Sequence, residues 1–323
     1  MRLILHAGTH KTATKTFQAY LVKNKEAFKE SGLIFPQPSA ERQDKRYWAH
    51  NWLAQALAGH HEEDTAMARE MLDRAARQAR GEGALVLSAE DISCCCAGHP
   101  LWSGLDRGDF RDLQREYLRL FAEVVKGFQV EVVMLFRRAD VYAQSLYQTV
   151  IRSHRFTGSF ESWLKYGRPL FEYAKQLEIF TEVFGNVQAL SYHKLSGHLP
   201  HNLLVSLGYD LPRNPLSIRN VSTDPRLTCW TWMRNSISLP SREEIRTQKR
   251  FCRSEYVRQL FADFGSATFW HCAEDAAEFH REASMGMDPG RFPPPSAHSG
   301  ISAYIDEATY TRISEAFELW EGT

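Results

Sequence analysis

The sequence predicts an α/β fold of three layers, in which helices cover both faces of a central, mainly parallel sheet, and a helical C-terminal extension follows. Short apolar runs alternate with amphipathic stretches of helical period over roughly the first two thirds of the 323 residues. The later part shows mostly helical periodicity, and we find no internal repeat, low-complexity tract or linker. We therefore expect a single domain over residues 1–323, with 222–323 as the mostly helical extension.

Each element is expected from its local pattern. The strands are apolar runs that end at polar or glycine residues, and they are expected at 3–7, 84–88, 130–136 and 187–192, with a small edge strand at 33–35. The helices are expected from apolar residues that recur at helical spacing, and they begin near Thr14 and then occupy 48–59, 62–80, 109–126, 140–153, 159–166, 170–184, 198–207, 224–236, 242–263 and 306–320.

Composition excludes several classes of function. The chain has 39 Lys+Arg and 39 Asp+Glu, and such a neutral balance makes a general nucleic-acid binder unlikely. No apolar run reaches the roughly 18 residues that span a bilayer, and the N-terminal apolar run is too short for a signal peptide. Six cysteines, three of them adjacent at Cys94–Cys96, form no CxxC pair, so we expect reduced thiols, a cytoplasmic protein and no metal.

Reactive side chains follow three of the expected strands. The first strand runs into the loop Gly8–Lys11, the second leads to Glu90, and the third ends at Arg137. In parallel sheets, ligands gather at the carboxyl ends of the strands. These three positions are therefore expected to meet at one edge of the sheet.

The first of these loops has the ingredients of an anion-binding site. Gly8 permits a tight turn, Lys11 supplies a positive charge, and the N–H groups of the following helix point toward a bound anion. Thr12, Thr14 and Thr16 add hydroxyl donors. The loop is not a Walker A motif, because Lys11 follows Gly8 after only two residues and has no glycine directly before it.

A second anion-binding pair is expected at the third strand. Arg137 ends that strand, and Ser145 follows eight residues later, about two turns into the next helix. The guanidinium offers two parallel N–H donors to a phosphate, and the serine offers a neutral hydroxyl. Together with the first loop, this pair predicts a nucleotide that carries two separate phosphate groups.

These two motifs resemble those of the PAPS-dependent sulfotransferases, whose sulfuryl donor is 3′-phosphoadenosine 5′-phosphosulfate (PAPS). The segment Gly8-Thr9-His10-Lys11-Thr12-Ala13-Thr14 is similar to the 5′-phosphosulfate loop of bacterial members, and Arg137 with Ser145 is similar to their 3′-phosphate element. The resemblance is firm over 3–20 and 130–153 and loose as far as about 225. Ala13 stands where glycine is usual, and the glycine-rich closing segment of animal members is absent from the sequence.

The resemblance implies a P-loop-like fold and the transfer of a sulfuryl group to a hydroxyl, in line and without a metal. Lys11 would neutralise the departing nucleotide, while backbone N–H groups from His10 to Thr14 and the hydroxyls of Thr12 and Thr14 would hold the 5′-phosphate. Arg137 and Ser145 would bind the 3′-phosphate. The acceptor would be a carbohydrate or another small molecule, and the loop 287–300, with Arg291, is a candidate for closing over the nucleotide.

Three residues are candidates for the base that deprotonates the acceptor. Glu90 comes first, because it follows the second strand directly and some carbohydrate sulfotransferases use a Glu at a comparable place. His50 comes second, and His10, within the phosphate loop, is the third. Each has a structural reading too: a helix-terminal carboxylate for Glu90, a core-edge histidine for His50 and a phosphate contact for His10. The sequence leaves the choice open.

Two other functions compete with this interpretation. A P-loop kinase or nucleotide hydrolase with a degenerate loop could use Glu90 on Mg²⁺, and its turnover of ATP or GTP would require the metal. A non-catalytic member would bind a nucleotide or partner without transferring any group. The acceptor and the oligomeric state, for which a homodimer is one option, cannot be read from the sequence.

Overall fold

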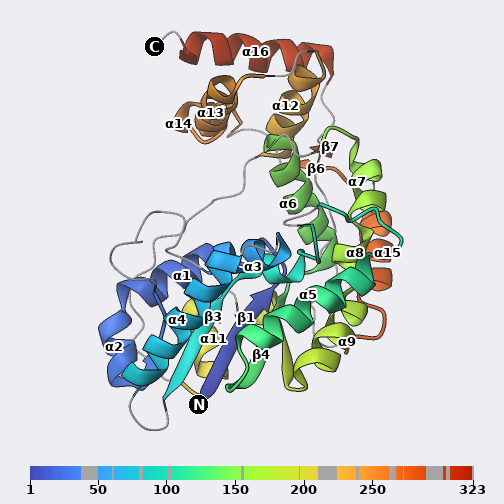
Figure 1. The fold of residues 1–323 in the computed structure, drawn as a ribbon. Coiled ribbons are helices and arrows are strands. Elements are labelled where there is room, and N and C mark those ends of the chain that lie inside the picture. Colours follow the sequence, from blue (N-terminus) through green and yellow to red (C-terminus); the bar gives the residue numbers. More distant parts are fainter. Residues whose placement is uncertain are drawn as a thin grey trace. The chain divides into compact units, whose positions relative to one another are not determined.

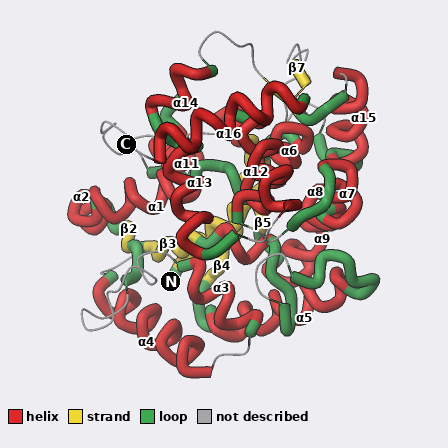
Figure 2. The backbone as a smooth tube through the Cα atoms, turned by 90° about the horizontal axis from the view of Figure 1, so that it is seen from above, coloured by secondary structure: helices red, strands yellow, loops and turns green. Residues whose placement is uncertain are grey.

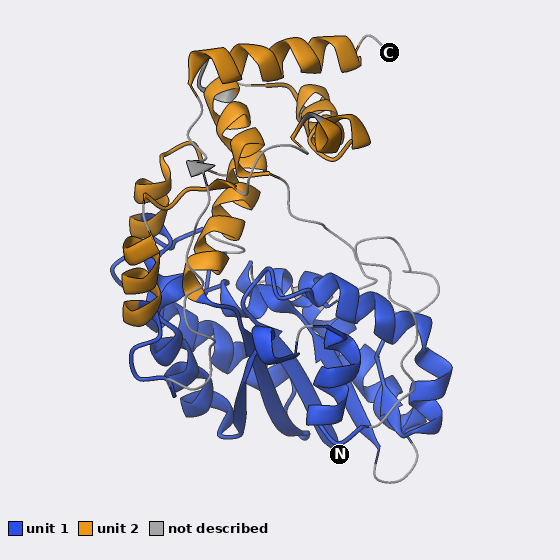
Figure 3. Ribbon diagram, turned by 180° about the vertical axis from the view of Figure 1, so that it is seen from behind, with its two compact units in different colours: residues 1–138, 166–219, 283–293 blue, residues 139–165, 220–282, 294–323 orange. Residues whose placement is uncertain are grey.

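The computed structural model describes residues 1–37, 50–59, 62–79, 83–99, 103–153, 156–195, 197–209, 224–237, 240–261, 267–271, 273–288, 301–302 and 306–321. The chain forms two compact units, each assembled from three stretches of sequence (Figure 3). Unit 1 comprises residues 1–138, 166–219 and 283–293, and unit 2 comprises 139–165, 220–282 and 294–323. Whether the two units make one domain stays a prediction.

Unit 1 is built on a five-stranded sheet with the order β2-β3-β1-β4-β5, and every neighbouring pair is parallel (Figure 1). The strands are β1 (Arg2–Gly8), β2 (Leu33–Ile34), β3 (Ala84–Ser88), β4 (Gln129–Phe136) and β5 (Val187–Ser191). This confirms the predicted fold class, including the small edge strand. The central strand, β1, pairs with β3 on one side and with β4 on the other, so the three strands that precede the predicted site are direct neighbours.

Helices cover both faces of this sheet, with α1 and α11 on one face and α3, α4 and α5 on the other (Figure 2). The helices of unit 1 are α1 (Thr14–Lys23), α2 (Lys25–Glu30), α3 (Asn51–Ala58), α4 (Glu62–Gln78), α5 (Phe110–Val124), α8 (Arg168–Phe171), α9 (Tyr173–Phe184), α10 (Tyr192–Leu195) and α11 (Leu199–Ser206). Side chains alternate along β1 as a strand requires: Ile4 packs with Phe17 and Leu21 of α1, while Leu3 and Leu5 are buried against the opposite face.

Unit 2 is mostly helical over its described residues. Its helices are α6 (Ala139–Arg152), α7 (Phe160–Tyr166), α12 (Pro225–Ile237), α13 (Arg242–Phe251), α14 (Glu255–Leu260), α15 (Ala273–Ala283) and α16 (Glu307–Glu321), where the last residues of α7 and α15 fall in unit 1. Strand β6 (Ala267–Thr268) pairs with β7 (Ile301–Ser302). An aromatic core joins its C-terminal helices, with Trp230, Phe251 and Phe317 in mutual ring contact. The described residues of the C-terminal part confirm the predicted helical character, while the boundary at residue 222 stays a prediction.

Candidate functional site

The carboxyl ends of β1, β3 and β4 meet at the loop that follows β1. The amide of Thr9 donates to the Leu135 carbonyl of β4 at 3.1 Å, and the Ser93 hydroxyl, in the turn after β3, donates to the Gly8 carbonyl at 2.8 Å. Hydrogen bonds therefore attach the start of the following loop, residues 9–13, to β4, and the end of β1 to the turn after β3. We call residues 9–13 the phosphate loop.

Gly8 is required by the close approach of β1 to β4. A Cβ atom at Gly8 would lie 2.9 Å from the Leu135 nitrogen and 3.0 Å from the Leu135 oxygen, which is closer than real Cβ contacts come. The φ of Gly8 does not lie in the left-handed region. Glycine is therefore required here because a side chain would collide with β4, and not because the chain turns. The sequence analysis expected Gly8 to permit a tight turn, whereas the structure requires glycine there for this close approach.

The turn itself is made by two residues that are not glycine. Lys11 has φ 68° and Ala13 has φ 61°, both in the left-handed region, while Thr12 between them does not. Such conformations cost about 1–3 kcal/mol each and concentrate at functional sites. Backbones that alternate in handedness turn successive N–H groups toward one point, which is the arrangement that binds anions.

Two threonines of this region use their hydroxyls differently. The Thr12 hydroxyl donates to the Thr9 carbonyl at 2.7 Å and so closes the phosphate loop on itself. The Thr14 hydroxyl, at the first residue of α1, is buried and has no hydrogen-bond partner among the described residues. The amides of Thr12, Ala13 and Thr14 have no backbone partner there either. The donors that remain for a ligand are therefore these amides and the Thr14 hydroxyl.

The two predicted cations meet at the phosphate loop: Lys11 belongs to the loop, and Arg137 contacts its backbone from the end of β4. Arg137, the first residue after β4, donates from Nη1 to the Lys11 carbonyl at 3.2 Å. Its guanidinium also stacks over the Tyr192 ring, 5.4 Å from the ring centre, and the Tyr173 hydroxyl donates to its carbonyl at 2.8 Å. Both Lys11 and Arg137 are half-buried. The sequence missed Tyr192 and Tyr173, which no motif marks.

An acidic cluster lies on the other side of the phosphate loop, at η2 (Glu90–Ser93), the 3₁₀ turn that follows β3. Glu90 is 8% exposed, and its carboxylate lies 3.6 Å from Nδ1 of His10. Asp91 is also buried, and its Oδ1 lies 3.3 Å from Nε2 of His10. The structure therefore brings two of the three predicted bases, Glu90 and His10, into one cluster at the edge of the phosphate loop.

His50, the other predicted base, is held in the interior of unit 1. It is fully buried, its Nε2 donates to the Pro36 carbonyl at 2.8 Å, and its Nδ1 accepts from the Ser88 amide at 3.0 Å. Burial lowers its pKa to about 4, although the hydrogen bond to Pro36 opposes this. Because both ring nitrogens are already bonded, the geometry favours a structural role for His50 and gives no support to its predicted catalytic role.

Ser145 belongs to unit 2, on α6. It is 6% exposed, and its hydroxyl has no hydrogen-bond partner among the described residues. Its predicted role beside Arg137 stays a prediction. Arg291 and most of the predicted closing loop lie outside the described residues.

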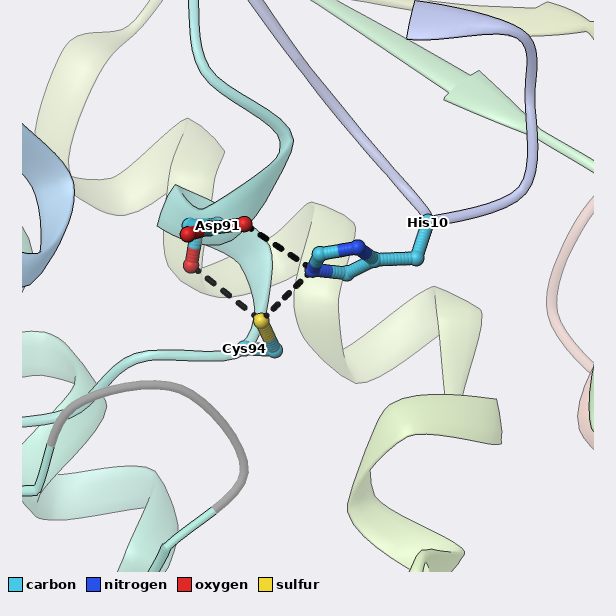
Figure 4. Close-up of side chains that lie close together, drawn as sticks. All are labelled: His10, Asp91 and Cys94. Carbon is cyan, nitrogen blue, oxygen red and sulfur yellow. Dashed lines mark hydrogen bonds and ion pairs between the residues drawn. The ribbon is translucent and has the colours of Figure 1, made fainter. Parts of the chain in front are cut away.

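A cysteine that the sequence analysis set aside completes the acidic cluster. Cys94 places its Sγ 3.0 Å from Nε2 of His10, and its thiol donates to the Asp91 carbonyl at 3.3 Å (Figure 4). Burial raises the pKa of this thiol well above its ordinary value, and neighbouring Cys95 and the carboxylates of Asp91 and Glu90 raise it further. A protonated buried thiol is a poor nucleophile, so the burial of Cys94 does not favour a cysteine-based hydrolase.

No family model matches the chain, and no curated protein matches it. Among solved structures, a sulfotransferase from Alicyclobacillus acidocaldarius is 14% identical with a TM-score of 0.37, over 76% of this chain and 99% of that one. A retinol dehydratase, solved with androsterone and the inactive cofactor PAP, is 15% identical with a TM-score of 0.29, over 98% and 80%. A structure from the PezAT toxin–antitoxin system of Streptococcus pneumoniae is 13% identical with a TM-score of 0.24, over 59% and 68%.

The structural neighbours of this chain thus include a sulfotransferase and a protein solved with PAP. Because these TM-scores are low, the similarity carries no evidence on function, and only the site of this chain does.

Proposed function

We propose that this chain is a sulfotransferase that moves a sulfuryl group from PAPS to a hydroxyl of a carbohydrate or another small molecule. The observation that carries the proposal is the phosphate loop itself: two left-handed residues, Lys11 and Ala13, precede a helix, and Arg137 is bonded to the Lys11 carbonyl. This combination collects N–H donors and two cations at one edge of a parallel sheet, as a doubly phosphorylated nucleotide requires.

The 5′-phosphate end of the nucleotide would bind at the N-terminus of α1. The amides of Thr12, Ala13 and Thr14 would donate to its oxygens, and so would the buried Thr14 hydroxyl. The Thr12 hydroxyl keeps the loop closed through Thr9 and so acts indirectly. The 3′-phosphate would be bound by Arg137 and, from the resemblance, by Ser145.

The transfer would proceed in line at sulfur. The acceptor oxygen forms a bond to sulfur while the bond from sulfur to the bridging oxygen of the 5′-phosphate breaks, and the electron pair of that bond leaves with the nucleotide, which becomes 3′-phosphoadenosine 5′-phosphate (PAP). Lys11 stabilises the negative charge that develops on the leaving phosphate. The acceptor proton passes to a carboxylate, so the atoms and charges balance without a metal.

Glu90 is the base that we propose for this step. It follows β3 directly, and β3 neighbours β1, so its carboxylate belongs to the same sheet edge as the phosphate loop. Nδ1 of His10 lies 3.6 Å from the Glu90 carboxylate and would hold it in place. His50 is not retained as a candidate because both of its ring nitrogens are bonded in the interior.

The test is transfer of radiolabelled sulfate from PAPS to a panel of sugars and small alcohols and phenols. The wild-type chain is expected to label one acceptor class, and Glu90→Gln is expected to lower kcat by about 10²–10⁴-fold while the affinity for PAP stays unchanged. Glu116→Gln, on exposed α5 surface, is the matched control. Equal activity of the two variants would remove Glu90 from the mechanism.

The same assay separates the proposal from the competing kinase or hydrolase. A sulfotransferase of this kind keeps its activity in the presence of a chelator of Mg²⁺ and leaves ATP and GTP intact. Mg²⁺-dependent turnover of ATP or GTP, without transfer from PAPS, would contradict the proposal. Binding of PAP without transfer to any acceptor would instead favour a non-catalytic nucleotide binder.

A further inference from the structure

Three side chains of different chemistry converge beside the phosphate loop. Potential ligand atoms of His10, Asp91 and Cys94 all lie within 4.8 Å of one another, and all three residues are buried (Figure 4). Nε2 of His10 is the shared centre, 3.3 Å from Oδ1 of Asp91 and 3.0 Å from Sγ of Cys94. An imidazole, a carboxylate and a thiol are the three side-chain types that bind Zn²⁺ in proteins.

The backbone explains why these atoms meet. Asp91 and Cys94 are three residues apart at the 3₁₀ turn η2, and a 3₁₀ helix has three residues per turn, so both side chains project from the same side. His10 comes from the phosphate loop, which follows the neighbouring strand β1. The Ser93 hydroxyl, bonded to the Gly8 carbonyl, fixes the turn against the loop. The arrangement is thus part of the framework of unit 1.

Two of the candidate ligands, Asp91 and His10, also have an outer partner. Oδ2 of Asp91 accepts a hydrogen bond from the Gln55 side chain on α3, which leaves Oδ1 directed at His10. Nδ1 of His10 lies 3.6 Å from the Glu90 carboxylate. Histidines that bind metals through one ring nitrogen commonly donate from the other to a carboxylate, which orients the ring. His10, with Asp91 at Nε2 and Glu90 at Nδ1, has this pattern.

Two of the ligand separations can be compared with those around a small tetrahedral ion. With ordinary Zn–N, Zn–O and Zn–S bond lengths, a tetrahedron separates nitrogen from oxygen by about 3.3 Å and nitrogen from sulfur by about 3.6 Å. The observed separation of Nε2 from Oδ1 matches the first value, and Sγ would have to move outward by about half an ångström to match the second. Mg²⁺ and Ca²⁺ prefer oxygen ligands throughout, and the thiol disfavours both.

We propose that His10, Asp91 and Cys94 bind a single Zn²⁺ ion, which cross-links the phosphate loop to the turn after β3 and leaves one coordination position for water. The proposal is independent of the proposed function, because it concerns the geometry of the loop and takes no part in the transfer step. It departs from the expectation of no metal, which rested on cysteine and histidine spacing along the chain. That spacing cannot reveal that His10 and Asp91 lie close together, because the two residues are 81 positions apart in the sequence.

Without a metal, the same residues would form a hydrogen-bonded cluster. The Cys94 thiol would donate to the Asp91 carbonyl, and the His10 ring would lie between the carboxylates of Asp91 and Glu90. The two states differ in a property that can be measured: only the zinc site needs the Cys94 sulfur as a thiolate. Replacement of that sulfur by oxygen therefore separates them.

The experiment is equilibrium dialysis of the full chain against micromolar Zn²⁺, followed by metal analysis. Wild type is expected to retain about one Zn²⁺ per chain, and Cys94→Ser and Asp91→Asn are expected to lose it. Cys96→Ser, in the same run of cysteines but outside the cluster, is the matched control and is expected to retain the ion. Glu90→Gln should also retain it, because the amide oxygen can still accept from His10.

A second measurement begins with the wild-type chain alone. Co²⁺ in place of Zn²⁺ is expected to give wild type the intense near-ultraviolet absorption of a thiolate–cobalt bond, and Zn²⁺ is expected to raise its melting temperature. Loss of the absorption in Cys94→Ser but not in Cys96→Ser supports the site. Absence of the absorption in wild type, or equal zinc retention by Cys94→Ser and wild type, would overturn it.

Discussion

Thr12 and Thr14 carry the same side chain two residues apart, but the structure predicts opposite consequences for their loss. Thr12→Val removes the hydrogen bond to Thr9 and is expected to lower the free energy of unfolding by about 1 kcal/mol. Thr14→Val removes a buried hydroxyl that has no partner among the described residues, so stability is expected to be unchanged or higher, while affinity for PAP falls. Urea unfolding and PAP titration of both variants check this, and a reversed pattern would contradict the assignment.

Two buried histidines give the protein an acid-sensitive interior. Burial lowers the pKa of His50 and of His6 to about 4, opposed by the Pro36 hydrogen bond and by the Glu90 charge respectively. The unfolded chain, with histidine pKa values near 6.5, then binds more protons than the folded chain between about pH 6.5 and 4. Stability therefore falls as the pH falls through this window, by roughly 2 kcal/mol for each histidine between pH 7 and 5.

The variant His50→Gln checks that assignment. It keeps a donor and an acceptor but cannot titrate, so its unfolding free energy is expected to change less between pH 7 and 5 than that of wild type, even if it is lower overall. Urea unfolding at both pH values measures the difference. An identical pH dependence in the two proteins would show that His50 is not buried in its neutral form.

At single residues, the sequence could predict what local chemistry reveals. Gly8 ends a strand, Lys11, Arg137 and Glu90 follow strands, and neighbouring parallel strands bring such positions together. Cys94 could not be found this way, because its partner His10 is distant in sequence and lies on another strand end. The geometry gives no support to a catalytic His50, and the sequence could not show this because a pattern shows residue type but not which hydrogen bonds a buried ring already makes.

The element that defines the site is the junction of the phosphate loop with α1. Ala13 precedes this helix with φ 61°, a conformation that costs a non-glycine residue about 1–2 kcal/mol. Ala13→Gly is expected to remove that strain and to raise stability by about 0.5–1 kcal/mol after the greater entropy of the unfolded glycine chain is included. Ala19→Gly, inside the same helix, is the matched control and is expected to lower stability by about 1 kcal/mol.

Thermal or urea unfolding of the two alanine variants decides the point. If Ala13→Gly destabilises the protein as much as Ala19→Gly does, the left-handed conformation at Ala13 is wrong. The sign of the effect, more than its size, is the informative result.

Other elements show which strands and helices the periodicity of apolar residues can predict. The strands of the sheet were predicted within one or two residues, because each is a buried apolar run bounded by polar residues. The helix predicted over 242–263 is in fact two, α13 and α14, since Ser254 caps the second one by accepting from the Val257 amide. Helix α15 was missed among its many charged residues, although its first turn carries Glu274 and Asp275.

At the scale of the molecule, charge placement matters more than charge balance. The 39 basic and 39 acidic residues cancel, yet Lys11 and Arg137 stand at one sheet edge and the carboxylates of Glu90 and Asp91 stand beside them. No helix in the described part of the chain is long and apolar enough to cross a membrane.

The two units are each made of separate stretches of sequence, so neither can be isolated by a single cut in the chain.

A neutral molecule with a local cationic site should discriminate among anions. We expect PAP to bind at about 0.15 M salt while heparin and double-stranded DNA do not, because polyanion binding needs an extended basic surface. Retention on a heparin column and a DNA mobility-shift assay measure this. Binding of DNA with an affinity comparable to that for PAP would contradict the expectation of no nucleic-acid partner.

The measurement that tests the central claim most directly is calorimetric titration of the chain with PAP. Wild type is expected to bind, Lys11→Ala and Arg137→Ala are expected to bind roughly ten- to hundredfold more weakly, and Lys15→Ala, on the exposed side of α1, is expected to bind like wild type. Arg119→Ala, on α5, is the control for the lost guanidinium. Undetectable binding by wild type, or equal affinities for wild type, Lys11→Ala and Arg137→Ala, would contradict the account.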